Sequence, residues 1–179
     1  DFRHVITTLE EQLQIQPVAI QIPIGAEDRF EGVVDLITMQ AYYFDEAGYG
    51  VDFECRKLSG ELEAEANLAR AELLDQLSLH DDELTEKLLE ETEPDIEEII
   101  SVLRRETLSG SITPVLCGSA FKNKGVQQLM DAVVDFLPSP LDIPPVIGIH
   151  PVTEKEVSRN ASVDDPLCVL AFKVATDPF

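Results

Sequence analysis

Apolar side chains at the start of the chain recur with the period of an amphipathic helix. They are Phe2, Val5, Ile6, Leu9 and Leu13. Residues 59–108 have a helical pattern as well. The first helix there follows Ser59, which we expect to cap it by accepting a hydrogen bond from a first-turn amide. Its apolar face is Leu62, Ala66, Ala69, Leu73 and Leu77.

Two more helices are predicted before residue 110. One begins near Asp82 and turns three leucines inward, Leu84, Leu88 and Leu89. The other opens with Pro94 in its first turn and ends at Ser109 and Gly110. The residues that share its apolar face are Ile96, Ile99, Ile100 and Leu103.

The remaining apolar runs are short and predict strands. They cover residues 17–23, 32–36, 39–44, about 51–55, 112–117 and 167–174. After the fifth of these runs, a further amphipathic helix is predicted through Val126, Leu129, Met130, Val133 and Leu137. Residues 138–145 contain four prolines and favour an extended, stiff linker, so we place a domain boundary there.

Both ends of the sequence have the character of interruptions. The first helical pattern has no capping residue before it, and the strand-like run at 167–174 has no later strand with which to pair. We therefore expect the chain to be a fragment of a longer protein.

Composition narrows the function. The 179 residues are 44% hydrophobic and 27% charged, as in globular proteins with a real core, but the formal net charge is −22. That charge argues against direct binding of nucleic acid, which needs clustered Lys and Arg, and favours a basic partner surface. Because no apolar run approaches the ~18 residues of a membrane span, we expect no membrane partner. We also expect a cytoplasmic location.

Few residues are candidates for chemistry. Cys55, Cys117 and Cys168 are scattered beside apolar residues, and we interpret them as three buried thiols in a reducing compartment. The three histidines lie far apart and lack the spacing of a zinc site, so no metal site is predicted. The chain has no G-x-x-x-x-G-K-[ST] phosphate loop and no nucleophilic triad, so no catalytic residue is assigned.

The segment "GSAFKNKG", residues 118–125, joins a predicted strand to a predicted helix, where α/β proteins bind ligands. Its small side chains would let a flat ring approach the backbone amides. An N–H group that faces position six of a purine selects guanine, which has an acceptor there. Lys122 and Lys124 could cover the ring or meet phosphate. The spacing alone, however, favours an ordinary connection with two solvated lysines.

Longer stretches around this segment carry a family resemblance. Residues 114–145, "PVLCGSAFKNKGVQQLMDAVVDFLPSPLDIPP", closely resemble bacterial translation elongation factor G. The resemblance extends to "PIGAEDRFEGVVDLITMQAYYF" at 23–44 and "LAFKVATDPF" at 170–179, and so covers essentially the whole chain. It matches Ser119, Ala120 and Phe121 to the fifth guanine-nucleotide motif of the family, whose backbone contacts the base.

The resemblance implies an α/β fold with an α+β insert, which is part of a P-loop GTPase domain. Residues 1–14 would be a helix of that domain, 15–110 the inserted G-prime subdomain of mixed sheet and helix, and 111–143 the end of the GTPase domain. Residues 144–179 would supply the first strands of a β-barrel second domain. GTP or GDP and Mg²⁺ would bind the parent protein, and we expect none bound to this chain alone.

The function implied is that of a ribosomal translocase, a GTPase that drives tRNA and mRNA movement in protein synthesis. The partners would be the ribosome, including its stalk protein. Only the intact parent protein would contact tRNA and mRNA. A related translational GTPase of the ribosome-protection or release-factor type is the first alternative. The second is a protein-docking module without nucleotide binding.

The docking alternative has its own residues. Glu61, Glu65, Leu68 and Glu72 line one flank of the helix predicted after Ser59, and we call them the acidic flank. In the resembled family this subdomain is implicated in meeting the stalk protein. Other interpretations are a merely solvated acidic surface, a Leu68 that extends the core, or docking on the opposite, small and polar face of the helix.

Overall fold

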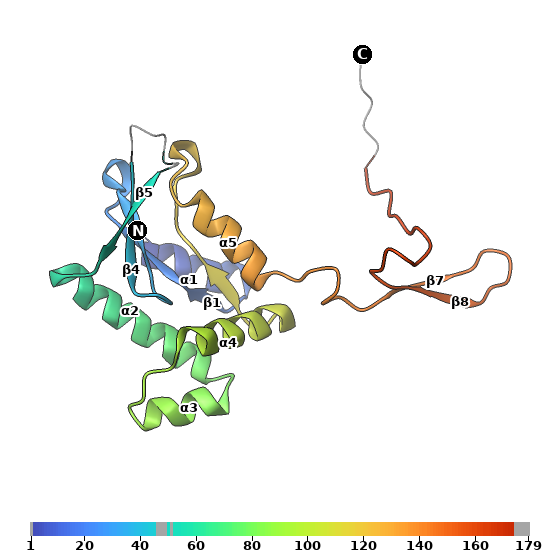
Figure 1. Cartoon of the computed structure of the whole chain (residues 1–179), viewed down its shortest axis with the longest axis horizontal. Helices are drawn as coiled ribbons and strands as arrows, with labels where there is room; N and C mark the ends of the chain where they lie inside the picture. Colours follow the sequence, from blue (N-terminus) through green and yellow to red (C-terminus); the bar gives the residue numbers. More distant parts are fainter. Residues whose placement is uncertain (1, 46–49, 51, 174–179) are drawn as a thin grey trace, which may run out of the picture. The chain divides into compact units, whose positions relative to one another are not determined.

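The computed structural model of the chain describes residues 2–45, 50 and 52–173. These residues form a mixed α/β fold (Figure 1). The chain divides into two compact units, Asp1–Leu137 and Pro138–Phe179. In the described part of the chain, no helix combines the length and the apolar character needed to cross a membrane.

The larger sheet of the first unit is antiparallel, with the strand order β2-β3-β4-β5. Its strands are β2 (Gln21–Ile24), β3 (Gly32–Asp35), β4 (Gln40–Phe44) and β5 (Phe53–Lys57). The strands predicted at 32–36 and 39–44 are confirmed. The strand predicted at about 51–55 begins at Phe53 in the structure, and residue 51 lies outside the described residues.

A second, parallel pair of strands joins distant parts of the sequence. It consists of β1 (Pro17–Ala19) and β6 (Thr113–Val115), paired in register from Pro17 opposite Thr113. The single strand predicted at 17–23 is therefore wrong, because the chain bends at Ile20 and enters two sheets. The amide of Ile20 donates to Val115 O at 3.0 Å, while its carbonyl accepts from the Leu36 amide at 3.0 Å.

All five predicted helices are present. They are α1 (Phe2–Leu13), α2 (Gly60–Ser78), α3 (Asp82–Leu89), α4 (Ile96–Ser109) and α5 (Val126–Phe136). Asp95 and Glu98 form a reciprocal capping box at the start of α4, and Gly110 ends it at φ 78°. Ser59 precedes α2 as expected, but its side chain makes no capping hydrogen bond, which corrects that prediction. Pro94 precedes the Asp95 cap and does not lie in the first turn.

The core of the first unit lies between one face of the four-stranded sheet and the helices α2 and α4. On α2 it contains Ala66, Ala69, Leu73 and Leu77, as predicted, with Leu62 partly buried beside them. Val34 of β3 and Leu36, which comes directly after β3, lie in this core. Val33 points to the other face of the sheet and packs with Phe30 and Phe44. This alternation is the two-residue period of a strand.

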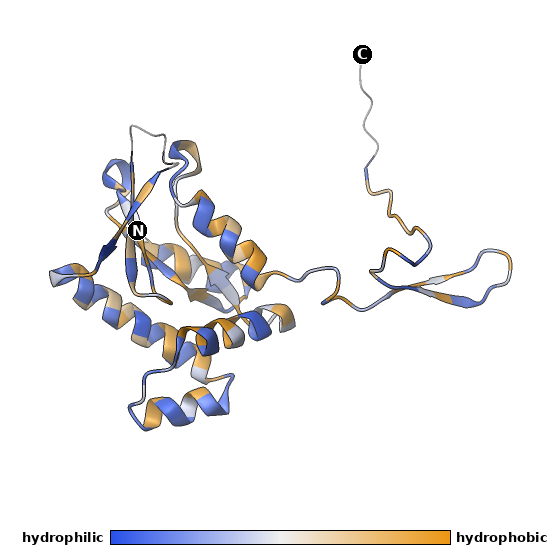
Figure 2. Ribbon diagram, viewed as in Figure 1, coloured by the Kyte–Doolittle hydropathy of each residue, from blue (hydrophilic) through white to orange (hydrophobic). Residues whose placement is uncertain are grey.

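Some apolar positions that the helical period turned inward are exposed. Leu89 is 81% exposed and Ile96 is 44% exposed, since each lies at a helix end where the packed face has already turned away. On α5 the buried residues are Ala132 and Phe136. Four residues of the predicted apolar stripe of α5 are exposed instead, and apolar colour is visible along the helix in Figure 2: Leu129, Met130, Val133 and Leu137.

The second unit contains a two-stranded antiparallel hairpin. Its strands are β7 (Val146–Ile149) and β8 (Glu156–Arg159). The strand predicted at 167–174 is wrong over residues 167–173, which have no strand structure, and residue 174 lies outside the described residues. Leu170 and Phe172 are more than 80% exposed. A β-prone segment remains irregular when no neighbouring strand accepts its backbone hydrogen bonds.

Candidate functional site

The candidate site is the turn at residues 118–125, which lies beyond the carboxyl end of β6. That end of a strand is where open α/β sheets place their ligand sites. From Val115 the chain runs through Cys117 and Gly118 to a short 3₁₀ helix at Ala120–Lys122, then to α5. The turn is therefore held at one side by a paired strand and at the other by a helix.

Backbone hydrogen bonds close the turn on itself. The Ser119 and Lys124 amides donate to each other's carbonyl oxygens, at 2.9 and 3.0 Å, and the Lys122 and Asn123 amides donate back to Ser119 O and Ala120 O. Within the described residues, the amides of Ala120 and Phe121 donate to no backbone acceptor. The two amides of the matched motif that remain available are thus adjacent.

Two glycines are required by the turn itself. A Cβ atom at Gly118 would lie 2.7 Å from Lys124 O, and Gly125 has φ +84°, in the left-handed region. These requirements would hold in an ordinary connection as well as in a ligand site. The glycines therefore explain the shape of the turn without identifying a ligand.

A cavity of about 190 Å³ lies against the turn. It is smaller than the roughly 300–1,000 Å³ typical of a complete small-molecule pocket, so it suits one part of a ligand. Its lining comes from the end of β6, the turn and the first turns of α5: Leu116, Cys117, Gly118, Ser119, Ala120, Lys124, Gly125, Val126 and Leu129. Two of the three predicted motif residues, Ser119 and Ala120, belong to this lining.

Phe121 projects fully into solvent, with a relative exposure of 105%. Burying an aromatic side chain is favourable, so a fully exposed ring does not contribute the hydrophobic free energy that its burial would give. A planar ligand stacked on this ring would recover part of it. Ser119 is half-buried and Ala120 exposed, so the three residues offer a hydroxyl, free amides and an aromatic face in sequence order.

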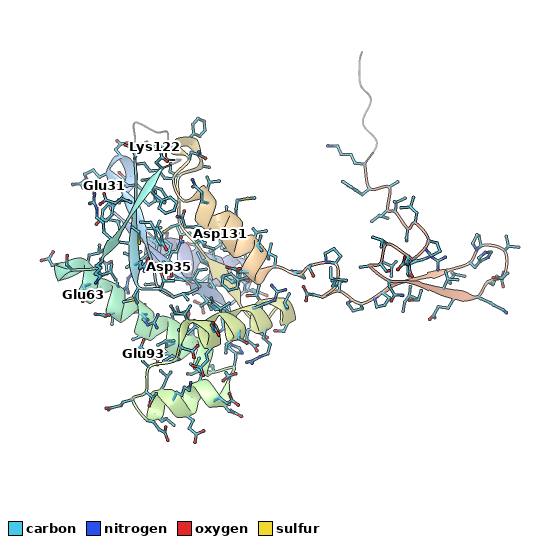
Figure 3. The ribbon with its side chains drawn as sticks, in the orientation of Figure 1. Glu31, Asp35, Glu63, Glu93, Lys122 and Asp131 are labelled. Atoms are coloured by element: carbon cyan, nitrogen blue, oxygen red, sulfur yellow. The ribbon has the colours of Figure 1, made fainter. Side chains whose placement is uncertain are left out.

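The two lysines of the turn have different surroundings. Lys122 is exposed, and Figure 3 labels it at the edge of the first unit. Lys124 is 2% exposed, and its Nζ atom donates to Phe30 O at 2.8 Å. The expectation that Lys124 is solvated, covers a base or meets phosphate is therefore wrong, because its ammonium group is buried against the loop before β3. Sequence reasoning missed this contact, since 94 positions separate the two residues.

The cysteines correct another expectation. Cys55 and Cys168 are exposed rather than buried, since every residue of the edge strand β5 is exposed and Cys168 lies in an irregular segment. Burial raises the pKa of the Cys117 thiol to about 12. No cluster of three or more His, Cys, Asp or Glu side chains suited to a metal ion occurs among the described residues.

We expect Cys117 to resist alkylation up to pH 9, because the thiolate is the nucleophile and its fraction remains very small well below a pKa of about 12. Timed iodoacetamide labelling with peptide mass spectrometry should show Cys55 and Cys168 modified first. Denaturation should remove the difference. Labelling of Cys117 in the folded chain as fast as Cys55 would contradict the buried assignment.

The acidic flank lies on α2, where Leu68 is 56% exposed. This exposure rules out the interpretation that Leu68 extends the core. Glu65 and Glu72 line a groove of about 830 Å³ between α2 and the segments α1, β1 and β2, and Arg3 of α1 pairs with Glu72 at 3.7 Å. Glu61 and Leu68 lie outside that groove lining, so the structure splits the flank into a groove pair and an outer pair.

No protein-family model matches the chain. Among solved structures, the chain is similar to the crystal structure of a protein from Thermus thermophilus, with a TM-score of 0.66 and 22% sequence identity. The similarity covers 88% of this chain and 24% of that protein, so the chain spans about a quarter of the length of the structure it matches. At this level of identity, the likeness shows that the two proteins share a fold.

Proposed function

We propose that this chain is part of a translational GTPase of the elongation factor G type, in which the turn at residues 118–125 contacts the guanine base of GTP or GDP. The observation that carries the proposal is the pair of available amides at Ala120 and Phe121, beside a cavity at the carboxyl end of β6. An amide donor there would meet the guanine O6 acceptor, whereas adenine presents a donor.

The residues present fit one side of a base and no more of a nucleotide. A bound GTP or GDP would supply the phosphates. Mg²⁺ would supply the charge stabilisation used in phosphoryl transfer. This chain would contribute orientation of the base, through its amides and the exposed Phe121 ring. Its sequence contains no phosphate loop, so the grip on the phosphates would come from other parts of a longer protein.

The strand pairing supports a refined division of the chain within this proposal. Because β1 pairs with β6 in parallel, residues 17–19 group with the GTPase part. The inserted subdomain would then begin near residue 20, five residues later than the start at residue 15 that the family resemblance implies. Residues 111–143 would complete the GTPase domain, and the β7–β8 hairpin would belong to the second domain.

A second candidate function is docking of a partner protein on the acidic flank. The observation that favours it is the exposed side chain of Leu68, with Glu65 and Glu72 one turn away on either side of it along α2. In the resembled family the partner would be the ribosomal stalk protein. Both functions can belong to one protein, and a nucleotide assay and a partner-binding assay separate them.

The guanine contact can be tested by removing one amide. Ala120→Pro deletes the N–H group at the start of a 3₁₀ helix, and Ser119 at φ −129° and ψ 97° already has a conformation compatible with a following proline. In the intact gene product we expect a roughly 2- to 10-fold loss of GDP affinity with ADP affinity unchanged.

Ala120→Ser is the matched control, since it keeps the amide and should keep the GDP affinity. Calorimetry of the 179-residue chain with millimolar GDP should be flat, because a few base contacts do not hold a nucleotide. Equal affinity of the gene product for GDP and ADP would refute the guanine contact, and micromolar GDP affinity of the 179-residue chain would refute the division of labour.

A further inference from the structure

The candidate turn is attached to the four-stranded sheet by several contacts that the proposed function does not require. Cys117 packs against the buried cluster formed by Phe30, Val33 and Phe44 on the second face of that sheet. The amide of Cys117 also points at the side-chain oxygen of Gln21 in β2, at 3.4 Å. The strand that leads into the turn therefore rests on the sheet before the turn begins.

A first contact is made by the buried side chain of Lys124. An ammonium group that is taken out of water costs free energy unless hydrogen bonds replace its hydration. Lys124 is 2% exposed, and its Nζ donates to the carbonyl of Phe30 at 2.8 Å, at the end of the connection between β2 and β3. The backbone of the same lysine closes the turn through Ser119, so its side chain joins the turn to the sheet.

A second contact comes from the connection between β4 and β5. Gly50 in that connection is buried and has φ +70°. A Cβ atom placed on it would lie 2.5 Å from Lys122 O and 2.9 Å from the carbonyl carbon of Asn123. The backbone of Gly50 therefore lies directly against the backbone of the turn, on the segment that follows Ala120 and Phe121.

We propose that the four-stranded sheet positions the guanine-contacting turn through Lys124 and Gly50, and thereby sets how tightly the turn holds a guanine base. The proposal rests on the proposed function. Lys124 and Gly50 act as positioning residues: neither touches the base, and each fixes the backbone that carries the available amides.

The first test uses Lys124→Met, which keeps the length of the side chain and removes its donor. In the 179-residue chain, hydrogen exchange at the amides of Ser119, Lys122 and Lys124 should become roughly tenfold faster, with exchange in β3 and β4 unchanged. Lys57→Met removes an exposed ammonium group from the same sheet and should leave the turn unchanged.

The second test measures base selectivity in the intact gene product, by competition of GDP and ADP against a fluorescent guanine nucleotide. Lys124→Met should reduce the preference for GDP roughly tenfold while leaving ADP affinity as it is. A residue with a merely structural role would weaken both nucleotides together.

Gly50→Ala tests the same link from the other side, and it decides the matter if Lys124→Met does not fold. Its new methyl group would displace Lys122 O, so we expect the same loss of selectivity. Gly110→Ala is its matched control: Gly110 has a similar φ of +78°, but a Cβ there meets nothing within 4 Å. Equal effects of the two alanine variants would assign the result to backbone strain and overturn the proposal.

The outcomes separate the two levels of the argument. A wild-type preference for GDP that survives both Lys124→Met and Gly50→Ala overturns the positioning role and leaves the guanine contact standing. A wild-type protein that binds GDP and ADP equally overturns the guanine contact and the positioning role together. Faster exchange in the turn with a reduced GDP preference supports both.

Discussion

Replacing Arg70 with methionine is expected to lower the free energy of unfolding of the first unit by about 2–4 kcal/mol. The Arg70 side chain is 11% exposed and reaches from α2 to the connection after β3, where Nη1 donates to Leu36 O at 2.6 Å and to Ile37 O at 2.9 Å. Methionine keeps the apolar stem but leaves both carbonyl oxygens without this donor. Urea unfolding followed by circular dichroism measures the change.

Glu93→Gln is the control for that substitution. Glu93 pairs with Arg70 at 2.7 Å, but its side chain is 72% exposed. Exposed ion pairs contribute about 0–1 kcal/mol, so the control should cost little. If Glu93→Gln destabilised the unit as much as Arg70→Met, the ion pair with the connection between α3 and α4, rather than the two carbonyl contacts, would account for the stabilisation by Arg70.

The local features of this fold were predictable from the sequence. Helix spacing and the Gly110 stop act within a few residues, and the corresponding helices are present, although α4 begins with the Asp95 and Glu98 capping box in place of the predicted Pro94 start. The same holds for β3 and β4, which are joined by a short connection and carry strand-like side chains. These signals depend on neighbours in sequence, so a pattern can record them.

Features that depend on distant partners were not predictable. The run at 17–23 has the composition of one strand, and the bend at Ile20 arises because residues near 115 and near 36 accept and donate on opposite sides of it. Residues 167–173 have strand composition without a strand, because composition does not supply a pairing neighbour. Exposure of Leu89 follows from where α3 ends, which the hydrophobic period does not record.

The candidate site shows the same division. The strand, the glycine turn and the helix were predictable from the sequence, whereas the choice of Ser119, Ala120 and Phe121 came from the family resemblance and stays a prediction. The burial of Lys124 was not predictable, since a lysine in a polar octapeptide is most often solvated and its acceptor, Phe30 O, belongs to another element. The structure thus shows what the sequence did not, namely that a hydrogen bond from Lys124 to Phe30 O connects the turn to the segment before β3.

Reversing the charge of the acidic flank is expected to slow association with the proposed stalk partner. In the triple variant Glu61→Lys, Glu65→Lys and Glu72→Lys, we expect a roughly tenfold lower association rate at low salt, because charges around a contact mainly steer the encounter. The difference in association rate between the wild type and the triple variant should shrink at physiological salt, where screening limits the range of exposed charges to about 8 Å. Stopped-flow mixing with the isolated stalk domain, and with ribosomes, measures the rates.

The pairing of Glu72 with Arg3 sharpens this prediction. Arg3 already offsets part of the Glu72 charge, so Glu61 and Glu65 should account for most of the steering. A lysine at 72 beside Arg3 costs little stability, since both side chains are more than half exposed. Exchanging Glu83 and Glu86 of α3 and Glu97 of α4 for lysine changes the net charge of the chain by the same amount, away from the acidic flank. This triple variant serves as the matched control. Equal slowing in both triple variants would attribute the effect to net charge and refute a docking site on the acidic flank.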